Sequence, residues 1–256
     1  MADMSGKVAL VTGASSGIGR ATAELFAERG CRVVLAARRE AELAGLAKSI
    51  ASRGTQATAV ETDVSVATDV EKMVQHAIDA YGRLDFAINC AGVEGKTYAI
   101  GDLPEDEWDQ VLDINLKGTY LCLKYESRAM LKCGNGAAIV NVGSINSFLG
   151  YPTFSAYCAS KHGLIGLTSS VSAELAPHGI RVNLVCPGII DTPMHRRARK
   201  LFGDEAYDAF LQNSVHMKRA GQPGEIARSI AFLCSDDASY VTGTTLTPDG
   251  GFHLTV

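Results

Sequence analysis

Three side chains in the middle of the chain have types and spacing suited to proton transfer at an oxygen atom. Tyr157 and Lys161 lie four residues apart within 155–161, so they share one face if that stretch is helical. An ammonium group beside a phenol favours the phenolate, although a phenol that titrates near pH ~10 needs a shift of roughly three units to ionise near neutrality. Ser144, thirteen residues before Tyr157, could donate a hydrogen bond to the same oxygen. The set predicts acid–base chemistry on a carbonyl or alcohol oxygen. The plain alternative is one buried ring and one solvated amine.

A glycine-rich loop near the N-terminus supports the chemical reading. It follows the apolar run 8–11 and precedes a helical pattern over 20–29, the strand–loop–helix order of a dinucleotide site. Glycines let the backbone approach a pyrophosphate, and the helix N-terminus offers free N–H groups. The spacing is G-x-x-x-G-x-G, and any tight turn can use glycines. The cofactor contacts expected in this loop are Gly13, Ser15, Ser16, Gly17, Ile18 and Gly19.

These features, with others in the same order, resemble the classical short-chain dehydrogenase/reductase family over nearly the whole chain. The matching residues are Thr12 to Gly19, Asp63-Val64, Asn89-Cys90-Ala91-Gly92, Asn115, Ser144, Tyr157 with Lys161, Pro187-Gly188, Thr192 and Asp249-Gly250-Gly251. Cys90 departs from the family's Asn-Asn-Ala-Gly turn, so one side-chain contact differs there while the backbone turn is expected to remain.

The resemblance implies hydride transfer between a nicotinamide and a carbon that bears oxygen. Tyr157 is then the acid or base and Ser144 orients the oxygen. Lys161 lowers the phenol pKa, helped by the cationic nicotinamide, and binds the nicotinamide ribose. Asn115 is implied to support a water in a proton relay to the lysine, and a solvated polar residue is the alternative. Further cofactor contacts are implied at Asp63, Val64, Asn89, Ala91, Gly92, Pro187, Gly188, Ile190 and Thr192.

The end of the second predicted strand favours NADP(H) over NAD(H). NAD-preferring relatives place an aspartate at the position of Ala37, and that carboxylate would repel a 2′-phosphate with roughly −1.5 to −2 charges. Here Arg38 follows, and its forked donors suit phosphate. Arg38 and Arg39 also sit where a helix begins, which the helix dipole disfavours without a bound anion. A solvated basic pair balanced by Glu40 and Glu42 is the alternative.

Alternating sequence patterns predict one α/β domain over 1–256. Apolar runs at 8–11, 32–37, 57–61, 85–89, 137–142, 181–186 and 244–247 alternate with amphipathic stretches, which is typical of βαβ units. Residues 67–81 read as one helix, and 105–133 as one long helix in which Trp108 packs. The expected fold is a Rossmann-like, doubly wound parallel seven-stranded sheet with helices on both faces. The strand order 3-2-1-4-5-6-7 is implied by the resemblance.

Composition argues against several other classes. The net charge of −4 gives no basic field for nucleic acid. No apolar run approaches the ~18 residues of a membrane span, and the first residues lack the core of a signal peptide. Seven cysteines without a C-x-x-C pair indicate free thiols in a reducing cytoplasm, and no metal site is expected.

The substrate is the least constrained part of the prediction. Residues 191–217 are expected to form a lid whose basic residues make a solvated amphipathic helix more readily than an anion site. The expected substrate contacts are Ser144, Asn146, Phe148, Tyr151, Val93, Glu94 and His195. Their mixture of apolar and polar groups suits a small hydroxy or oxo compound, cyclic or aliphatic.

We therefore expect a cytoplasmic, NADP(H)-dependent alcohol dehydrogenase or carbonyl reductase that acts on a small ketone or secondary alcohol. Relatives commonly form tetramers, so a homotetramer is expected, with a dimer as the alternative. A second hypothesis is a 3-oxoacyl-[acyl-carrier-protein] reductase that docks its carrier on Arg128 and Lys132 or on 196–200. A third is a non-catalytic dinucleotide-binding regulator, but a regulator has no use for the full proton-transfer set.

Overall fold

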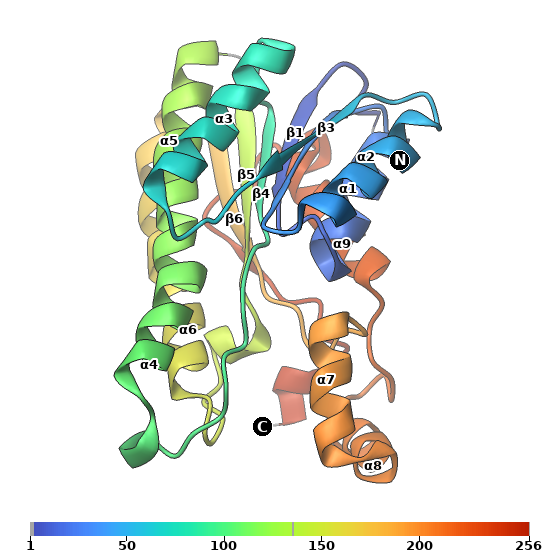
Figure 1. Cartoon of the computed structure of the whole chain (residues 1–256), viewed down its shortest axis with the longest axis vertical. Coiled ribbons are helices and arrows are strands. Elements are labelled where there is room, and N and C mark those ends of the chain that lie inside the picture. The colour runs from blue at the N-terminus through green and yellow to red at the C-terminus, as the bar shows by residue number, and fades with distance from the viewer. Residues whose placement is uncertain (1–2, 135, 256) are drawn as a thin grey trace.

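A seven-stranded parallel sheet lies between two layers of helices (Figure 1). The computed structural model describes residues 3–134 and 136–255. The strands are β1 (Val8–Thr12), β2 (Arg32–Ala37), β3 (Ala57–Glu61), β4 (Phe86–Asn89), β5 (Ala137–Val142), β6 (Ile180–Val185) and β7 (Thr245–Leu246). Their order across the sheet is β3-β2-β1-β4-β5-β6-β7, which confirms the predicted doubly wound fold.

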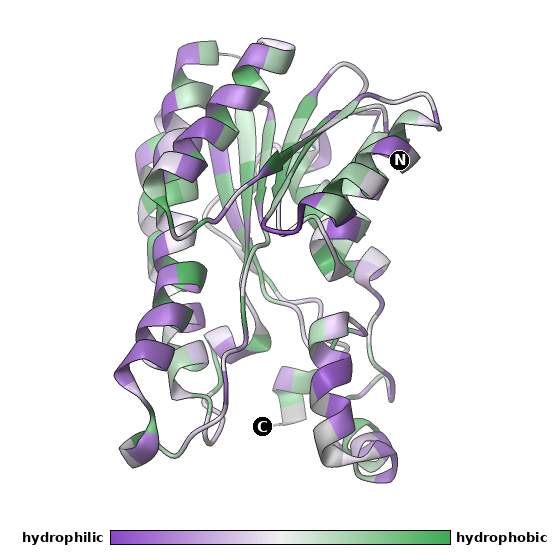
Figure 2. Cartoon of the chain, viewed as in Figure 1, coloured by the Kyte–Doolittle hydropathy of each residue, from purple (hydrophilic) through white to green (hydrophobic). Residues whose placement is uncertain are grey.

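The central strands are buried on both faces. In β1, Val8 and Leu10 pack into one hydrophobic core while Ala9 and Val11 pack into another, because successive side chains of a strand point to opposite faces. The continuous apolar runs of the sequence come from this two-sided burial. Figure 2 shows the resulting hydrophobic strands enclosed by helices of mixed polarity.

Each face of the sheet is covered by its own helices. One face carries α1 (Gly17–Glu28), α2 (Glu40–Ala51) and α9 (Pro223–Cys234), and the other carries α3 (Ala67–Tyr81), α5 (Gly118–Cys133) and α6 (Ser155–Leu175). Phe26 of α1 meets Phe86 edge-on, with ring centroids 5.8 Å apart. On the opposite face Met73 and Met130 fill the core between α3 and α5.

The helix predicted over 105–133 contains a π-helical turn. Helix α4 (Glu105–Leu112) leads into a π-helical turn, Asp113–Lys117, before α5 begins. The N–H of Gly118 donates to the carbonyl of Asp113, and the Thr119 hydroxyl donates to the carbonyl of Asn115 at 2.8 Å. Residues 105–133 are helical throughout, which confirms the predicted long helix, but the π-helical turn within it was not predicted, because one extra residue hardly disturbs the apolar spacing. Such turns are frequent at functional sites, and this one carries the fully buried Asn115.

A small separate layer faces the carboxyl ends of the strands. It contains α7 (Pro193–Phe202) and α8 (Asp204–Ser214), which lie below the sheet in Figure 1 and near the C-terminus. Its own hydrophobic cluster consists of Ile145, Tyr207, Leu211, Val215 and Phe252. Doubly wound folds bind ligands at the carboxyl ends of the strands where the strand order reverses, here beside β1 and β4. Of the helices described, none is both long enough and apolar enough to cross a membrane.

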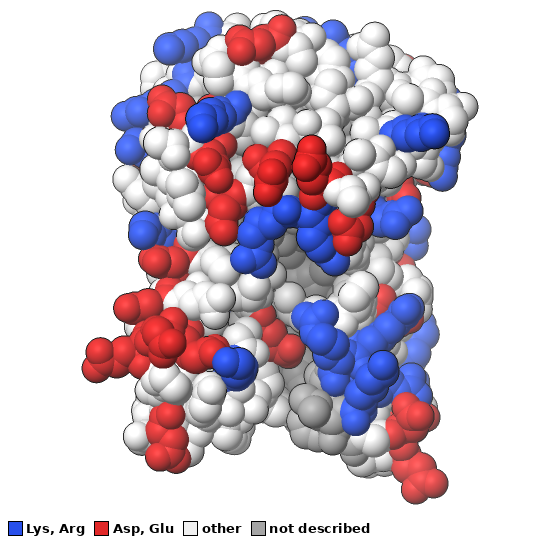
Figure 3. Space-filling view, in the orientation of Figure 1, with Lys and Arg blue, Asp and Glu red and all other residues white. Residues whose placement is uncertain are grey.

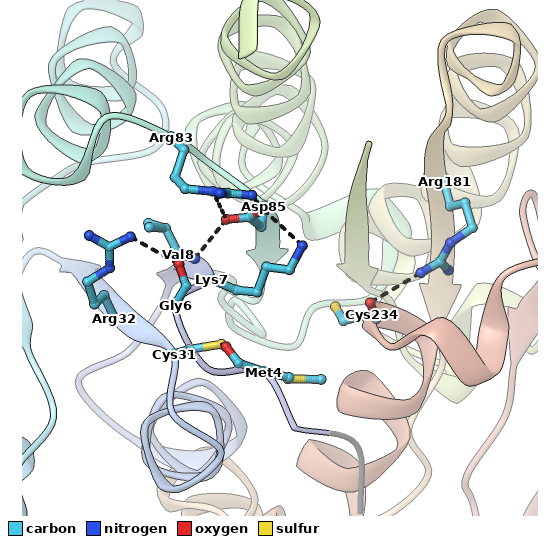
Figure 4. A network of polar contacts seen from close by, with 10 residues as sticks. All are labelled: Met4, Gly6, Lys7, Val8, Cys31, Arg32, Arg83, Asp85, Arg181 and Cys234. Atoms are coloured by element: carbon cyan, nitrogen blue, oxygen red, sulfur yellow. Dashed lines mark hydrogen bonds and ion pairs between the residues drawn. The ribbon is translucent and has the colours of Figure 1, made fainter. Parts of the chain in front are cut away.

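A buried carboxylate joins the amino ends of the central strands β1 and β4 (Figure 4). Asp85 is 1% exposed and accepts hydrogen bonds from the backbone N–H of Val8 at 2.9 Å and from Arg83 Nε at 2.8 Å. Lys7 Nζ lies 3.6 Å from its other oxygen. At the same end of the sheet, Arg181 donates to the Cys234 carbonyl at 3.2 Å and so connects β6 to the end of α9.

Replacing Asp85 with alanine is expected to destabilise the protein by about 1–3 kcal/mol, because the buried N–H of Val8 loses its acceptor, while the partly exposed Lys7 and Arg83 can be solvated. Denaturant unfolding at one fixed protein concentration measures the loss. Arg53→Ala is the matched control, since Arg53 pairs with Glu28 at 3.5 Å and both side chains are more than half exposed. That exposed pair is expected to contribute less than about 1 kcal/mol. Equal effects of the two substitutions would contradict the structural role given to Asp85.

Candidate active site

Helix α6 places Tyr157 and Lys161 on one face, as their spacing predicts. Lys161 is 5% exposed, and its Nζ lies 5.7 Å from the centroid of the Tyr157 ring. The ammonium donates a hydrogen bond to the carbonyl of Val142, the last residue of β5, at 3.0 Å. The side chains therefore meet at the carboxyl end of β5, and the alternative of a solvated lysine is excluded.

Ser144 enters the same space from the loop after β5. Its hydroxyl oxygen accepts a hydrogen bond from the Asn146 N–H at 3.2 Å and caps the short 3₁₀ turn Ile145–Ser147. The hydroxyl also lies 3.5 Å from its acceptor Asn146 Oδ1, and a hydrogen bond between Ser144 and Tyr157 acts on the phenol. The turn thus holds the serine beside the tyrosine.

Burial dominates the acid–base properties of the pair. It raises the pKa of the Tyr157 phenol to about 12, against the lowering effect of the Ser144 hydrogen bond. It lowers the pKa of the Lys161 ammonium to about 8. The chain alone therefore keeps Tyr157 protonated at neutral pH, and the expected depression of its pKa is not produced by Lys161. The effect of desolvation on the phenol pKa is larger than that of the Lys161 ammonium, whose hydrogen bond goes to the Val142 carbonyl.

Asn115 joins three segments around this centre. Its Oδ1 accepts from the Val93 N–H at 2.8 Å, and its Nδ2 donates to the Val93 carbonyl at 2.9 Å and to Ser160 Oγ at 3.0 Å. The π-helical turn thereby fixes the loop after β4 against α6. A Cβ atom built on Gly92 would lie 3.2 Å from Asn115 Oδ1 and 3.6 Å from Lys161 Nζ, so Gly92 separates the asparagine from the lysine. The alternative of a solvated asparagine is excluded.

The glycine loop forms one end of a cavity of about 560 Å³, here called the first cavity. A Cβ on Gly13, whose φ is +68°, would lie 3.0 Å from the Ala91 backbone, and a Cβ on Gly19 would lie 2.4 Å from the Gly13 carbonyl oxygen. Helix α1 begins at Gly17, and within the described chain Ser16 makes no capping hydrogen bond. This arrangement fits a dinucleotide, whose pyrophosphate would face the open N–H groups of the helix.

Basic side chains stand beside the loop. Arg39 donates to Ser15 Oγ at 2.7 Å and to Ser16 Oγ at 2.8 Å, and Arg38 lies 3.9 Å from Asp63. Burial acts to raise the pKa of the Asp63 carboxyl, but hydrogen bonds from Ser65 and the charge of Arg38 together hold this pKa below its usual range. Lys and Arg side chains flank the hollow of this face in Figure 3. The first cavity therefore has a cationic rim.

A second cavity of about 360 Å³ adjoins the first under α7 and α8. Apolar side chains make up much of its wall, including Ile145, Ile189, Phe210 and Phe252. Both cavities are lined by the same six residues, which are Ile18, Glu94, Gly143, Tyr157, Thr192 and Met194. Tyr157 thus stands where the two cavities meet.

Comparison with known proteins decides the family. Residues 13–253 match the family model described as "Enoyl-(Acyl carrier protein) reductase". Short chain dehydrogenase/reductase astE of Aspergillus oryzae (strain ATCC 42149 / RIB 40) is 41% identical over 254 residues, which cover 98% of this chain and 96% of that protein. The chain belongs to the short-chain dehydrogenase/reductase family.

Two further members of the short-chain dehydrogenase/reductase family are similar over almost their full length. The 2,5-dichloro-2,5-cyclohexadiene-1,4-diol dehydrogenase of Sphingobium indicum (strain DSM 16412 / CCM 7286 / MTCC 6364 / B90A) is 39% identical over 253 residues, 98% of this chain and 99% of that one. The crystal structure of levodione reductase aligns with a TM-score of 0.94 at 34% identity, covering 98% and 99% of the two chains. The protein is accordingly an oxidoreductase of the type that acts on alcohols and ketones, and its family uses nicotinamide dinucleotides.

The structure brings most of the predicted short-chain dehydrogenase/reductase cofactor contacts into the first cavity. These are Gly13, Ser15, Ser16, Gly17, Ile18, Gly19, Arg38, Arg39, Asp63, Val64, Ala91, Gly92, Tyr157, Lys161 and Thr192. Pro187, Gly188 and Ile190 line the second cavity instead. Asn89 is buried behind the turn, where its Nδ2 donates to Glu126 and Asn141 at 3.0 Å each.

The predicted substrate contacts divide between the cavities. Ser144, Asn146, Tyr151 and His195 line the second cavity, Val93 lines the first, and Glu94 lines both. Phe148 lines neither of them and is 44% exposed. Sequence reasoning placed Tyr207 and Phe210 in the lid without a role, yet both line the second cavity. Their helical spacing within 204–214 was the only signal that they share a face.

Proposed function

We propose that the protein transfers a hydride between NADP(H) and the secondary alcohol or ketone carbon of a small, largely apolar compound. The observation that carries this proposal is the place of Tyr157, which lines both the dinucleotide-shaped first cavity and the apolar second cavity. An acid–base group at that junction is within reach of an oxygen on a substrate whose reacting carbon faces the cofactor.

The side chains of the site divide the work between them. The bound nicotinamide supplies or accepts the hydride. In the reductive direction Tyr157, protonated because of its raised pKa, gives its proton to the carbonyl oxygen, and Ser144 donates a second hydrogen bond to the same oxygen. Lys161, charged below its pKa of about 8, places a positive charge beside the phenolate that Tyr157 becomes. Asn115 positions the loop at Val93 and helix α6 around this pair.

The rim of the first cavity supports NADP(H) over NAD(H). Ala37 leaves the end of β2 without a carboxylate, while Arg38 and Arg39 both line the cavity there. Arg39 is already oriented by Ser15 and Ser16, so its fork is partly ordered before any phosphate binds. A 2′-phosphate at this rim would find two guanidinium groups and the hydroxyls of the glycine loop.

The second cavity supports a small cyclic or branched substrate. Its size falls within the range of small-molecule sites, and its few polar groups are set among apolar and aromatic side chains. Similarity to a cyclohexadiene-diol dehydrogenase agrees with a ring of this size. Glu94 lines both cavities, and burial raises the pKa of its carboxyl, with the charge of Arg197 acting against it.

Initial rates of the purified protein test this function directly. With NADPH, cyclohexanone and related small ketones are expected to be reduced at least tenfold faster than acetoacetyl-thioester, and NADPH is expected to be used in preference to NADH. Cyclohexanol with NADP⁺ checks the reverse direction. Dominance of the thioester would instead support 3-oxoacyl-[acyl-carrier-protein] reduction. Binding of NADPH without turnover of any compound would contradict the proposal.

A further inference from the structure

The wall of the second cavity contains a hydrogen-bonded pair that the chemistry at Tyr157 does not use. His195 Nε2 lies 2.6 Å from the hydroxyl oxygen of Tyr207, and the ring centroids are 5.1 Å apart. His195 comes from α7 and Tyr207 from α8, so the pair bridges the two lid helices. Both residues line the cavity. Polar groups set among apolar side chains are where a polar part of a ligand would be recognised, and this pair is one of the few such groups of the cavity.

The pair is neutral and held in place. Burial lowers the pKa of the His195 imidazole, so the ring is uncharged at neutral pH. Tyr207 is 6% exposed, and Arg199, which also lines the cavity, lies over its ring with Cζ 4.8 Å from the centroid. The charge of Arg199 is balanced by Asp204, whose Oδ1 lies 2.6 Å from its Nε. The pair therefore offers a fixed hydrogen-bonding group without a net charge.

A neutral histidine can either donate a hydrogen bond to the tyrosine oxygen or accept one from the tyrosine hydroxyl, depending on its tautomer. When the phenol donates to Nε2, the tyrosine oxygen is free to accept a hydrogen bond from an alcohol. When Nε2–H donates to the phenol oxygen, the phenol O–H is free to donate to a ketone. The same pair can thus bind a hydroxyl or an oxo group by exchanging tautomers. This suits a site that accepts either a hydroxyl or an oxo group on a ring carbon.

We propose that His195 and Tyr207 bind a second oxygen function of the substrate, remote from the carbon that exchanges the hydride. The inference rests on the proposed function and names its substrate class: neutral compounds with two oxygen functions, such as hydroxyketones, diols or diones on a ring. Ser144 and Tyr157 hold the reacting oxygen at one end of the cavity. The apolar side chains of Ile145, Phe210 and Phe252 contact the carbon skeleton between the two ends.

Paired substrates and Tyr207→Phe test the inference. The wild-type protein should reduce 4-hydroxycyclohexanone with a kcat/KM about tenfold above that of cyclohexanone, because only the former reaches the pair. Tyr207→Phe should remove most of this ratio while kcat/KM for cyclohexanone stays within about twofold. His195→Gln should have a similar effect. The double variant should lose little more than either single one, since the two residues act as one unit.

Tyr120→Phe is the control, because it removes a tyrosine hydroxyl at a 47% exposed residue that lines neither cavity. It should leave the ratio unchanged. The thermal midpoint and the KM for NADPH show whether each variant keeps its fold and its first cavity. Equal losses on both ketones in Tyr207→Phe would mean that the pair only joins α7 to α8, and would overturn the inference. An unchanged ratio would overturn it too.

The two levels of the proposal fail differently. Turnover of cyclohexanone with no preference for the hydroxyketone contradicts the second oxygen site alone. No turnover of either ketone by the wild-type protein contradicts the proposed function and this inference with it.

Discussion

Tyr157→Phe is expected to lower kcat by about 10²–10⁴-fold while the affinity for NADPH changes by less than about threefold. Phenylalanine fills the same space, so the junction of the two cavities keeps its shape. Only the hydroxyl that exchanges a proton with the substrate oxygen is removed. Ser144 still hydrogen-bonds that oxygen, but it has no neighbouring base to take up or supply the proton. The loss is therefore expected in the chemical step and not in binding.

Steady-state rates and a fluorescence titration with NADPH separate these effects. Tyr120→Phe on α5 is the control, because its ring is 47% exposed and it lines neither cavity. In the wild-type protein, ketone reduction and alcohol oxidation should both fall as the pH rises through about 8, because Lys161 then loses the positive charge that stabilises the phenolate of Tyr157. Residual activity of Tyr157→Phe should lack this dependence, because the variant forms no phenolate. Loss of NADPH binding together with turnover would show that the tyrosine is structural.

Ala37→Asp is expected to reverse the cofactor preference. A carboxylate at the end of β2 would lie on the rim of the first cavity beside Arg38 and would repel the 2′-phosphate of NADPH. The same carboxylate can accept hydrogen bonds from the ribose hydroxyls of NADH. We expect kcat/KM for NADPH to fall about a hundredfold and that for NADH to rise several-fold. The introduced repulsion carries most of the change in specificity.

Rates with both cofactors at saturating ketone measure the switch. Ala37→Ser is the matched control, since it adds a polar atom at the same position without a charge, and it should leave the preference for NADPH in place. A parallel fall in kcat/KM for both cofactors would indicate damage to β2. A wild-type preference for NADH would contradict the role assigned to the arginines.

The fold was largely predictable because its signals are local and repeated. The run Val8–Thr12 is apolar throughout since both faces of β1 are buried, and the glycine loop after it needs residues that allow close backbone approach. Hydrophobic spacing also gave α3 over Ala67–Tyr81 with the correct bounds. The edge strand β7 is shorter than the predicted 244–247, because only Thr245 and Leu246 pair with β6.

The parts of the site that could not be predicted depend on distances between segments far apart in the sequence. Nothing in the sequence shows that burial raises the pKa of Tyr157, since that depends on how tightly the loops close around it. The contact of Arg39 with Ser15 joins the ends of two strands and appears only after folding. The π-helical turn at Asn115 could not be predicted, because its one extra residue hardly changes the apolar pattern of the sequence. The hydrogen bond between Tyr207 and His195 forms only because α8 packs on α7.

The small hydrophobic cluster under the lid has a consequence for how this protein could diversify. Ile145, Tyr207, Leu211, Val215 and Phe252 pack together apart from the two large cores that hold the sheet. Because the lid is stabilised by its own cluster, it can open or be rebuilt at a lower free-energy cost than unfolding of the whole chain. Substitutions within 193–214 can then change which molecule is held while the sheet keeps the cofactor and the proton donor in register. Such a protein can therefore acquire a new substrate range through substitutions in α7 and α8 alone.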